Sequence, residues 1–164
     1  MKKFLKFAGI ISAVLAIAAF IFMMAGNALI NKVSDSVTLV EPGIRVIFGG
    51  KDGYVTYKLA ATALIAWILI LLAIIILIAG VVLPLLKVKA LEKFAGILNL
   101  VAVCALVVGG ILLFFTKPAY AGANDFNLDN YKLSFAFVFA AILAISGGAI
   151  AILPAAMDFV GKKK

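Results

Sequence analysis

The chain has 164 residues, of which 66% are hydrophobic and 13% are charged. A water-soluble domain carries about 25% charged residues, so this composition excludes an ordinary soluble domain and is typical of a membrane protein. The formal net charge is +8 and histidine is absent, which excludes histidine-based acid–base catalysis and the usual zinc sites.

Four long uncharged runs account for this composition. They occupy residues 7–31, 59–86, 94–116 and 133–157. A bilayer core of about 30 Å needs about 20 helical residues, and inside it each segment must bond its own backbone polar groups, as a helix does. We therefore predict an all-α integral membrane protein, a four-transmembrane-helix bundle that forms one domain over residues 1–164. Its helices are expected at 4–28, 58–86, 91–116 and 132–159.

The segment after the first helix, residues 33–57, differs from the rest of the chain. It contains Pro42-Gly43, a glycine-rich stretch at 49–53 and short β-branched runs. Pro-Gly suits the centre of a type II turn, and the alternation over 44–48 indicates a strand. We predict a small extracellular β-hairpin or three-stranded sheet in this first external loop, with strands near 37–40, 44–48 and 54–57.

A lone hairpin is marginally stable in water. The predicted sheet must therefore rest on the helices, or pair its open edge with a strand of a partner. Both alternatives, a passive cover and a partner-binding surface, stay open. The hypothetical partner surface comprises the second predicted strand and two phenylalanines at the start of the last helix: Ile44, Arg45, Val46, Ile47, Phe48, Phe135 and Phe139.

The second external loop, residues 117–131, is rich in turn-forming residues. Its oxygen-bearing side chains, among them Asn124 and Asp125, also suit a weak Ca²⁺ site, although their spacing is not that of an EF-hand. Cys104 is the only cysteine, so an internal disulfide is excluded. We expect Cys104 to be a small buried packing residue of the third helix.

Small residues recur at helical spacing on the second and fourth predicted helices. Membrane helices associate through close packing at such residues, because lipid already solvates their larger apolar side chains. The predicted packing residues are Ala66, Ala73, Gly80, Ala136, Ala140, Ala144 and Gly148.

Three short motifs occur twice and in the same order: KFAGI at 6–10 and 93–97, YKL at 57–59 and 131–133, and LP at 83–84 and 153–154. This order favours a two-plus-two internal repeat, with halves related by an axis along the membrane normal. The alternative is that the motifs recur without duplication, because equivalent positions favour the same residues: lysines suit inner helix ends and tyrosines suit the outer interface.

Lysines are distributed unequally between the two sides of this predicted topology. One side carries nine lysines and two acidic residues, a net charge of +7, and the other carries six basic and five acidic residues, a net charge of +1. Cytoplasmic segments have the excess of Lys and Arg, so we expect a protein of the plasma (cytoplasmic) membrane with both termini in the cytoplasm. The charge is then a topology signal, and nucleic acid is not expected as a partner.

Four helices, cytoplasmic termini and a long first external loop of β character, followed by a shorter one, resemble the claudin-like tetraspan plan. The resemblance covers the whole chain at the level of architecture. The family's first-loop signature of a Trp, a Gly-Leu-Trp and two cysteines is absent, because residues 33–57 contain neither Trp nor Cys. The family's disulfide and its junction-forming residues therefore have no counterpart here.

All seven acidic residues lie outside the membrane core of the predicted helices. Ion coupling and proton relays use ionisable groups inside the membrane, and a dithiol relay needs two cysteines. We therefore expect a non-enzymatic protein, without cofactor or metal, that works through protein–protein contacts as an assembly, scaffold or accessory subunit. Its expected partners are the lipid bilayer and another membrane protein or further copies of itself, in a homo-oligomer. The alternative is a subunit of an oligomeric pore or transport complex, whose apolar wall would gate by dewetting or pass something lipid-like.

Overall fold

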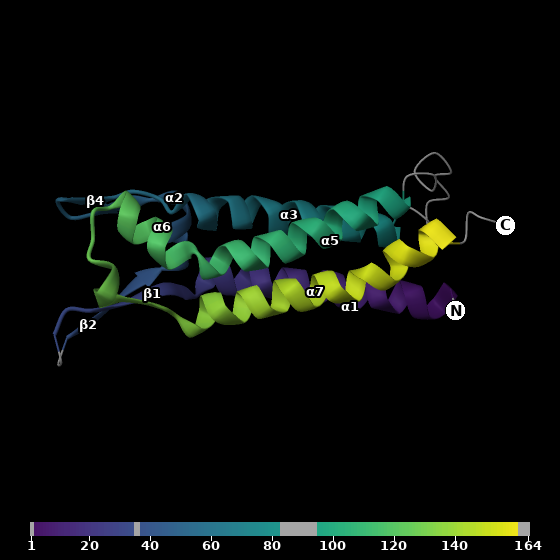
Figure 1. Ribbon diagram of the computed structural model, residues 1–164, viewed down its shortest axis with the longest axis horizontal. Coiled ribbons are helices and arrows are strands. Elements are labelled where there is room, and N and C mark those ends of the chain that lie inside the picture. Colours follow the sequence, from purple (N-terminus) through teal and green to yellow (C-terminus); the bar gives the residue numbers. More distant parts are fainter. Residues whose placement is uncertain (1, 35–36, 83–94, 161–164) are drawn as a thin grey trace.

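The computed structural model describes residues 2–34, 37–82 and 95–160. Four long helices lie side by side along the longest axis, and the two chain ends lie at the same end (Figure 1). The helices are α1 Lys2–Ala25, α3 Ala61–Val82, α5 Ala95–Phe114 and α7 Phe135–Val160. Each contains a segment long and apolar enough to cross a membrane: Phe7–Ala25, Ala61–Val82, Gly96–Phe114 and Phe135–Ala156.

The predicted presence of four long apolar helices is therefore confirmed, and these helices are typical of a membrane protein. Their bounds differ by a few residues from the prediction at the ends that the structure describes. The predicted helix ends at 83–86 and 91–94, and the lysines between them and at 162–164, lie outside the described residues.

The helices contact one another in a ring. Helix α5 packs against α3 and α7, and helix α1 packs against the same two helices. Most of the predicted packing residues lie at these contacts: Ala66, Ala73, Ala140, Ala144 and Gly148 are buried. The other two predicted packing residues are less buried: Ala136 of α7 is half-buried and Gly80 of α3 is exposed.

Two glycines allow α5 and α7 to approach closely. A Cβ atom at Gly148 would lie 2.8 Å from Cγ2 of Val107, and one at Gly110 would lie 2.7 Å from Cγ1 of Ile145. Both distances are shorter than carbon atoms tolerate, so only glycine fits without displacing a neighbour. Close backbone approach at small residues is the usual basis of helix association in lipid.

Ser12 and Asn99 occupy equivalent positions, two residues after each KFAGI motif. The hydroxyl of Ser12 donates a hydrogen bond to the backbone oxygen of Gly147 in α7, at 2.5 Å. Asn99 of α5 lies against α3, where its Oδ1 would be 3.4 Å from a Cβ on Gly80. Each residue thus reaches from the first helix of one half to the second helix of the other half, as a two-plus-two repeat predicts, although duplication itself stays a prediction.

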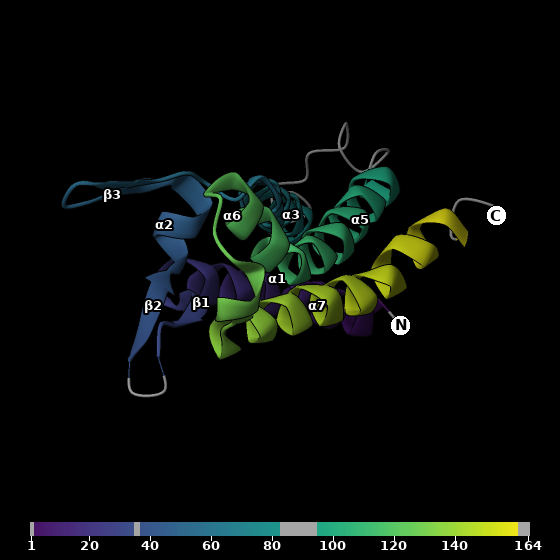
Figure 2. The same ribbon diagram turned by 60° about the vertical axis from the view of Figure 1, so that its left-hand side comes forward.

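The connections at the end opposite the termini form a folded layer, here called the distal region (residues 26–60 and 115–134). Its three-stranded antiparallel sheet has the order β2-β1-β5, formed by β1 Asn27–Lys32, β2 Thr38–Pro42 and β5 Tyr131–Leu133. A separate hairpin, β3 Gly50–Asp52 with β4 Val55–Tyr57, extends away from the helices beside α2 (Figure 2). The short helices are α2 Gly43–Phe48, α6 Thr116–Ala123 and the 3-10 turn η1 Leu128–Asn130.

The predicted strand over 44–48 is wrong, because these residues form helix α2. Gly43, Val46 and Ile47 are buried, which is the i, i+3, i+4 spacing of a helix and not the alternation of a strand. Gly43 is not part of a type II turn but begins the helix, where its N–H donates to the backbone oxygen of Gly26 at 2.8 Å. A Cβ on Gly43 would lie 1.9 Å from the backbone oxygen of Met23, so glycine lets α2 rest on the end of α1.

The sheet is also not confined to the first connection. Strand β1 takes residues that the prediction gave to the first helix, which ends at Ala25, and β5 comes from the second connection. Asn31 of β1 stands between Leu39 of β2 and Tyr131 of β5. The protein therefore has a three-stranded sheet, as predicted, but one of its strands comes from a segment 100 positions away, as the pair Asn31 and Tyr131 shows. No local sequence pattern indicates such a pair.

Candidate functional site

Glu41, at the end of strand β2, is a buried carboxylate in the distal region. It is only 5% exposed. The hydroxyl of Tyr120 in α6 donates to its Oε2 at 3.2 Å, and Nη1 of Arg45 in α2 lies 3.4 Å from the same oxygen. A buried charge is costly unless it is paired and hydrogen-bonded, and these two donors meet that need.

Arg45 extends this cluster toward the hairpin. Its Nη2 donates to Oδ2 of Asp52 in β3 at 2.8 Å, and its guanidinium lies 5.0 Å from the ring centroid of Tyr57 in β4. Partial burial lowers the pKa of Arg45, but the hydrogen bond and charge of Asp52, together with Glu41, outweigh it and raise that pKa overall. Arg45 is therefore a permanent cation that joins β2, α2 and the β3–β4 hairpin.

Tyr120 links Glu41 to a cluster of aromatic rings in the second connection. Tyr120 is fully buried, and its ring lies 6.1 Å from both Tyr131 and Phe126, centroid to centroid. Burial, and then the charge of Glu41, raise the pKa of Tyr120 far above its ordinary range. Burial, followed by Glu41 and Tyr57, raises the pKa of Tyr131 to about 12. Both phenols therefore stay protonated at neutral pH, and that of Tyr120 acts as a hydrogen-bond donor.

Asn124 makes a second link between the two connections. Its Oδ1 accepts from the backbone N–H of Lys58 at 2.6 Å, and its Nδ2 donates to the backbone oxygen of Lys58 at 3.0 Å. The same Nδ2 also donates to the backbone oxygen of Tyr120. Asn124 thus fixes the end of α6 to the chain just before α3, and its side-chain oxygen serves this contact. No group of residues in the described parts of the chain has the composition of a metal site.

Together these contacts fix the distal region. The Glu41 cluster (Glu41, Arg45, Asp52 and Tyr120) and Asn124 join the connection between α1 and α3 to the connection between α5 and α7. A single buried hydrogen bond contributes about 1 kcal/mol, and one to a charged group contributes more. Several such bonds across two connections hold the small strands in one position on the helices. The hydrogen bonds and ion pairs of the cluster thus give it a positioning role.

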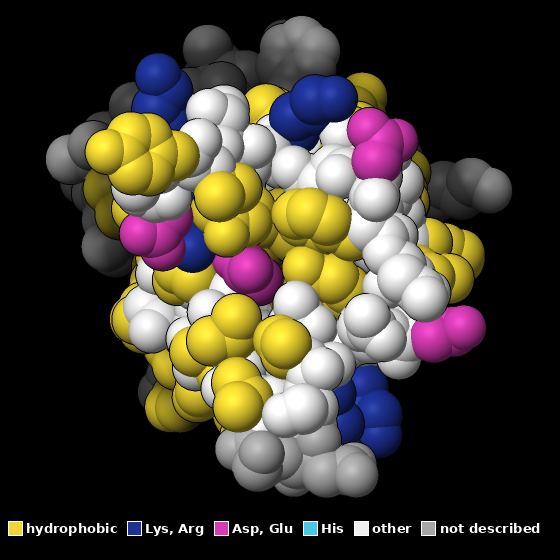
Figure 3. All heavy atoms as spheres, turned by 90° about the vertical axis from the view of Figure 1, so that its left-hand side faces the viewer, with side chains coloured by type: hydrophobic (Ala, Val, Ile, Leu, Met, Phe, Trp, Pro, Cys, Tyr) yellow, Lys and Arg dark blue, Asp and Glu magenta, His cyan; other side chains and the backbone are white. Residues whose placement is uncertain are grey.

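Several apolar side chains of the distal region remain exposed. The end face has apolar patches among its charged groups (Figure 3). Leu39 and Val40 of β2 are 53% and 50% exposed, and Tyr54, at the tip of the β3–β4 hairpin, is fully exposed. Exposed apolar residues on the long helices suit a lipid environment, but those of the distal region lie beyond the apolar helical segments.

The residues of the hypothetical partner surface are not on one face. Val46 and Ile47 are fully buried and Arg45 lies inside the Glu41 cluster, whereas Ile44 and Phe48 are exposed. The two phenylalanines of α7 stack on each other: Phe135 is 72% exposed, and its ring lies 5.3 Å from that of Phe139. For the exposed members, a role in partner binding stays a prediction.

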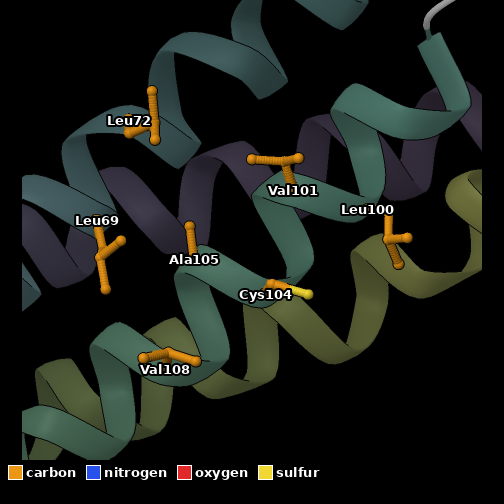
Figure 4. Close-up of a pocket in the computed structure, with 7 residues that line it drawn as sticks. All are labelled: Leu69, Leu72, Leu100, Val101, Cys104, Ala105 and Val108. Atoms are coloured by element: carbon orange, nitrogen blue, oxygen red, sulfur yellow. The ribbon is translucent and has the colours of Figure 1, made fainter.

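A shallow groove of about 330 Å³ runs between α3 and α5, and apolar side chains alone line it (Figure 4). It is lined by Leu69, Leu72, Leu100, Val101, Cys104, Ala105 and Val108. The prediction that Cys104 is buried is wrong, because its side chain is exposed on this outer side of α5. The groove offers no polar group for substrate recognition, and it lies within the segments long enough to span a membrane.

Sequence comparisons matched neither a protein-family model nor a curated protein to this chain. Sequence reasoning missed Glu41, Tyr120 and Asn124 as a linked set. No local signal marks them, because an acidic residue near the end of a short strand is ordinary on a surface, and only the burial of Glu41 in the folded protein makes its partners necessary.

Proposed function

We propose that the chain is a non-enzymatic membrane protein with four spans, and that it works through contacts with other proteins made by its distal region. In this proposal both termini face the cytoplasm and the distal region lies outside the cell. The unequal distribution of lysines supports that orientation. The position of the distal region, at the end opposite the termini, is compatible with it.

One observation carries the proposal. The buried Glu41 cluster holds the distal region in one position, and yet that region leaves Leu39, Val40 and Tyr54 exposed. Contiguous apolar patches, as on this end face (Figure 3), are typical of protein-contact sites when they lie outside the lipid. A rigid surface also loses little conformational entropy on binding, which favours affinity.

The test uses the full-length chain in the membranes of cells that naturally make it. A photo-crosslinking amino acid replaces Tyr54 or Leu39, which are exposed residues of the first connection. The same amino acid at Lys117, a half-buried residue of the second connection, gives the background. The proposal expects discrete protein adducts from Tyr54 or Leu39. If neither position gives an adduct above the Lys117 background, the proposal is wrong.

The orientation is tested separately. In a Cys104→Ser background, Tyr54→Cys is expected to react with a membrane-impermeant maleimide added to intact cells, whereas Lys3→Cys is expected to react only after the membrane is opened. The reverse pattern contradicts the orientation.

The alternative function, a subunit of an oligomeric pore, predicts that the purified protein conducts ions in planar bilayers. A protein that works only through contacts lacks this conductance.

A further inference from the structure

Strand β2 forms an open edge of the three-stranded sheet. In the order β2-β1-β5 it has a neighbour on one side only. The opposite edge, β5, is only three residues long and packs against α6, and its Tyr131 is 4% exposed. The open side of β2 is therefore the longer and the more accessible edge of this sheet.

The hydrogen bonds of the sheet show which backbone groups face the open side. Val33 donates its N–H to the backbone oxygen of Val37 at 3.0 Å, so this pair is hydrogen-bonded. Opposite residues in an antiparallel ladder alternate between bonded and non-bonded pairs. Along the register Lys32↔Thr38, Asn31↔Leu39 and Ile30↔Val40, Leu39 therefore bonds to β1, whereas Thr38 and Val40 direct their N–H and C=O groups away from it.

A second bond, on the far side of β1, gives the same result independently. Ser134 donates its N–H to the backbone oxygen of Ala28 at 2.9 Å, so Ala28 faces β5. Alternate residues of a strand face the same side, so Ile30 and Lys32 also face β5. Their opposite residues, Val40 and Thr38, must then face outward.

Within Thr38–Val40 this edge carries no charge, proline or bulge that would protect it against strand pairing. Natural edge strands carry lysine, proline or a bulge where they would otherwise take up another strand. Thr38, Leu39 and Val40 are uncharged, the bulge of this ladder lies at its far end between Asn27 and Leu29, and Pro42 is the last residue of β2. Leu39 and Val40 also present apolar side chains on opposite faces of the strand.

From these observations we infer that the open edge of β2 takes up an extended, uncharged segment of a partner protein, whose backbone bonds to the N–H and C=O groups of Thr38 and Val40. Lipid cannot supply such a ladder of donors and acceptors. A second copy's β2 is a poorer match. Antiparallel pairing of two identical strands requires a two-fold axis perpendicular to those strands. Two copies in one membrane are related by an axis that runs along their helices. The β1–β2 strands are inclined toward the direction of the helices, so they are not perpendicular to such an axis (Figure 1). This inference rests on the proposed function and names its mode of binding.

The test separates backbone pairing from side-chain contact. The full-length chain carries the photo-crosslinking amino acid at Leu39, combined with either Val40→Pro or Val40→Thr. Proline removes the outward N–H of residue 40 and is tolerated where an edge N–H faces outward, while threonine keeps both the N–H and the β-branched shape. We expect Val40→Pro to lower the yield of the Leu39 adduct about fivefold to tenfold, the effect of one lost hydrogen bond, and Val40→Thr to leave it within about twofold.

Folding is checked by the melting temperature of each variant in detergent. If Val40→Pro lowers it sharply, Thr38→Pro against Thr38→Val gives the same comparison at the other outward residue. Equal adduct yields for the proline and threonine variants overturn the inference, as does an adduct whose mass is two copies of this chain. In either case adducts persist and the proposed function stands. If Tyr54 and Leu39 both give no adduct, the proposed function itself fails.

Discussion

The phenolic hydroxyl of Tyr120 donates a hydrogen bond to the carboxylate of Glu41, with 3.2 Å between the two oxygens, although the residues are 79 positions apart in the chain. Glu41 belongs to the connection between α1 and α3, and Tyr120 to the connection between α5 and α7. The two halves of the molecule are therefore joined by a buried polar contact as well as by helix packing.

Removal of this contact is expected to destabilise the fold. Tyr120→Phe should lower the free energy of unfolding by about 1 to 2 kcal/mol, and Glu41→Ala by about 3 kcal/mol, because Arg45 then loses one of its two carboxylates. Denaturant unfolding in detergent, followed by the fluorescence of Trp67, measures both. The double variant should lose less than the sum of the single effects, and strict additivity would show that the residues do not interact. Tyr54→Phe, at a fully exposed position, is the matched control and should change nothing.

Alkaline pH is expected to destabilise the distal region through its buried phenols. The pKa of Tyr131 is raised from 10.0 to about 12 in the folded protein. Folding therefore favours the protonated form, so this stabilisation is fully present below about pH 10 and is lost as the pH rises through about 12. Melting temperatures measured across that window should fall, and those of Tyr131→Phe should fall less. Parallel curves for the two proteins would contradict the assignment.

Gly43→Ala is expected to be far more harmful than an alanine at another glycine of the distal region. Its Cβ would lie 1.9 Å from the backbone oxygen of Met23, so α2 must move away from the end of α1. The matched control is Gly122→Ala in α6, where a Cβ would meet nothing within 4 Å and helix propensity should improve by up to about 1 kcal/mol. Melting temperatures should therefore change in opposite directions, and an equal change at both positions would refute the close approach of Gly43.

Helix packing is tested by two neighbouring residues of α7. Gly148→Leu places a large side chain against Val107 and should lower the free energy of unfolding by about 1 to 3 kcal/mol. Ala149→Leu places the same side chain on an exposed position and should change the free energy of unfolding by less than about 0.5 kcal/mol. Unfolding by a denaturing detergent compares the two, and similar losses would mean that α5 and α7 do not pack at Gly148.

Much of the helical architecture could be predicted because its causes are local. The uncharged runs near residues 7–31 and 59–86 are long and apolar enough to cross a bilayer, and a segment that does so must bond its own backbone groups, as a helix does. The distal region was predicted less well. The sequence at 44–48, in which Arg45 is the one charged residue, is compatible with both a strand and a short helix, and the contact of Gly43 with the end of α1 favours the helix.

The candidate site illustrates the same limit. Glu41, Tyr120 and Asn124 carry no motif, and each is unremarkable within its own segment of the sequence. Their importance depends on pairing between connections that are distant in the chain, such as Asn31 with Tyr131 and Asn124 with Lys58. The partner surface was expected on residues 44–48 together with Phe135 and Phe139. Val46 and Ile47 are buried, and the open edge lies on the preceding strand, β2.

The sequence by itself determined that the chain has four long apolar helices and that its irregular structure lies between them, because burying backbone polar groups in hydrocarbon leaves few alternatives. Only the tertiary structure decided how the two connections combine: β5 pairs with β1, Tyr120 meets Glu41, and β2 is left at an open edge. Those contacts join residues far apart in the chain, and their energies depend on burial and on partners that no local pattern specifies.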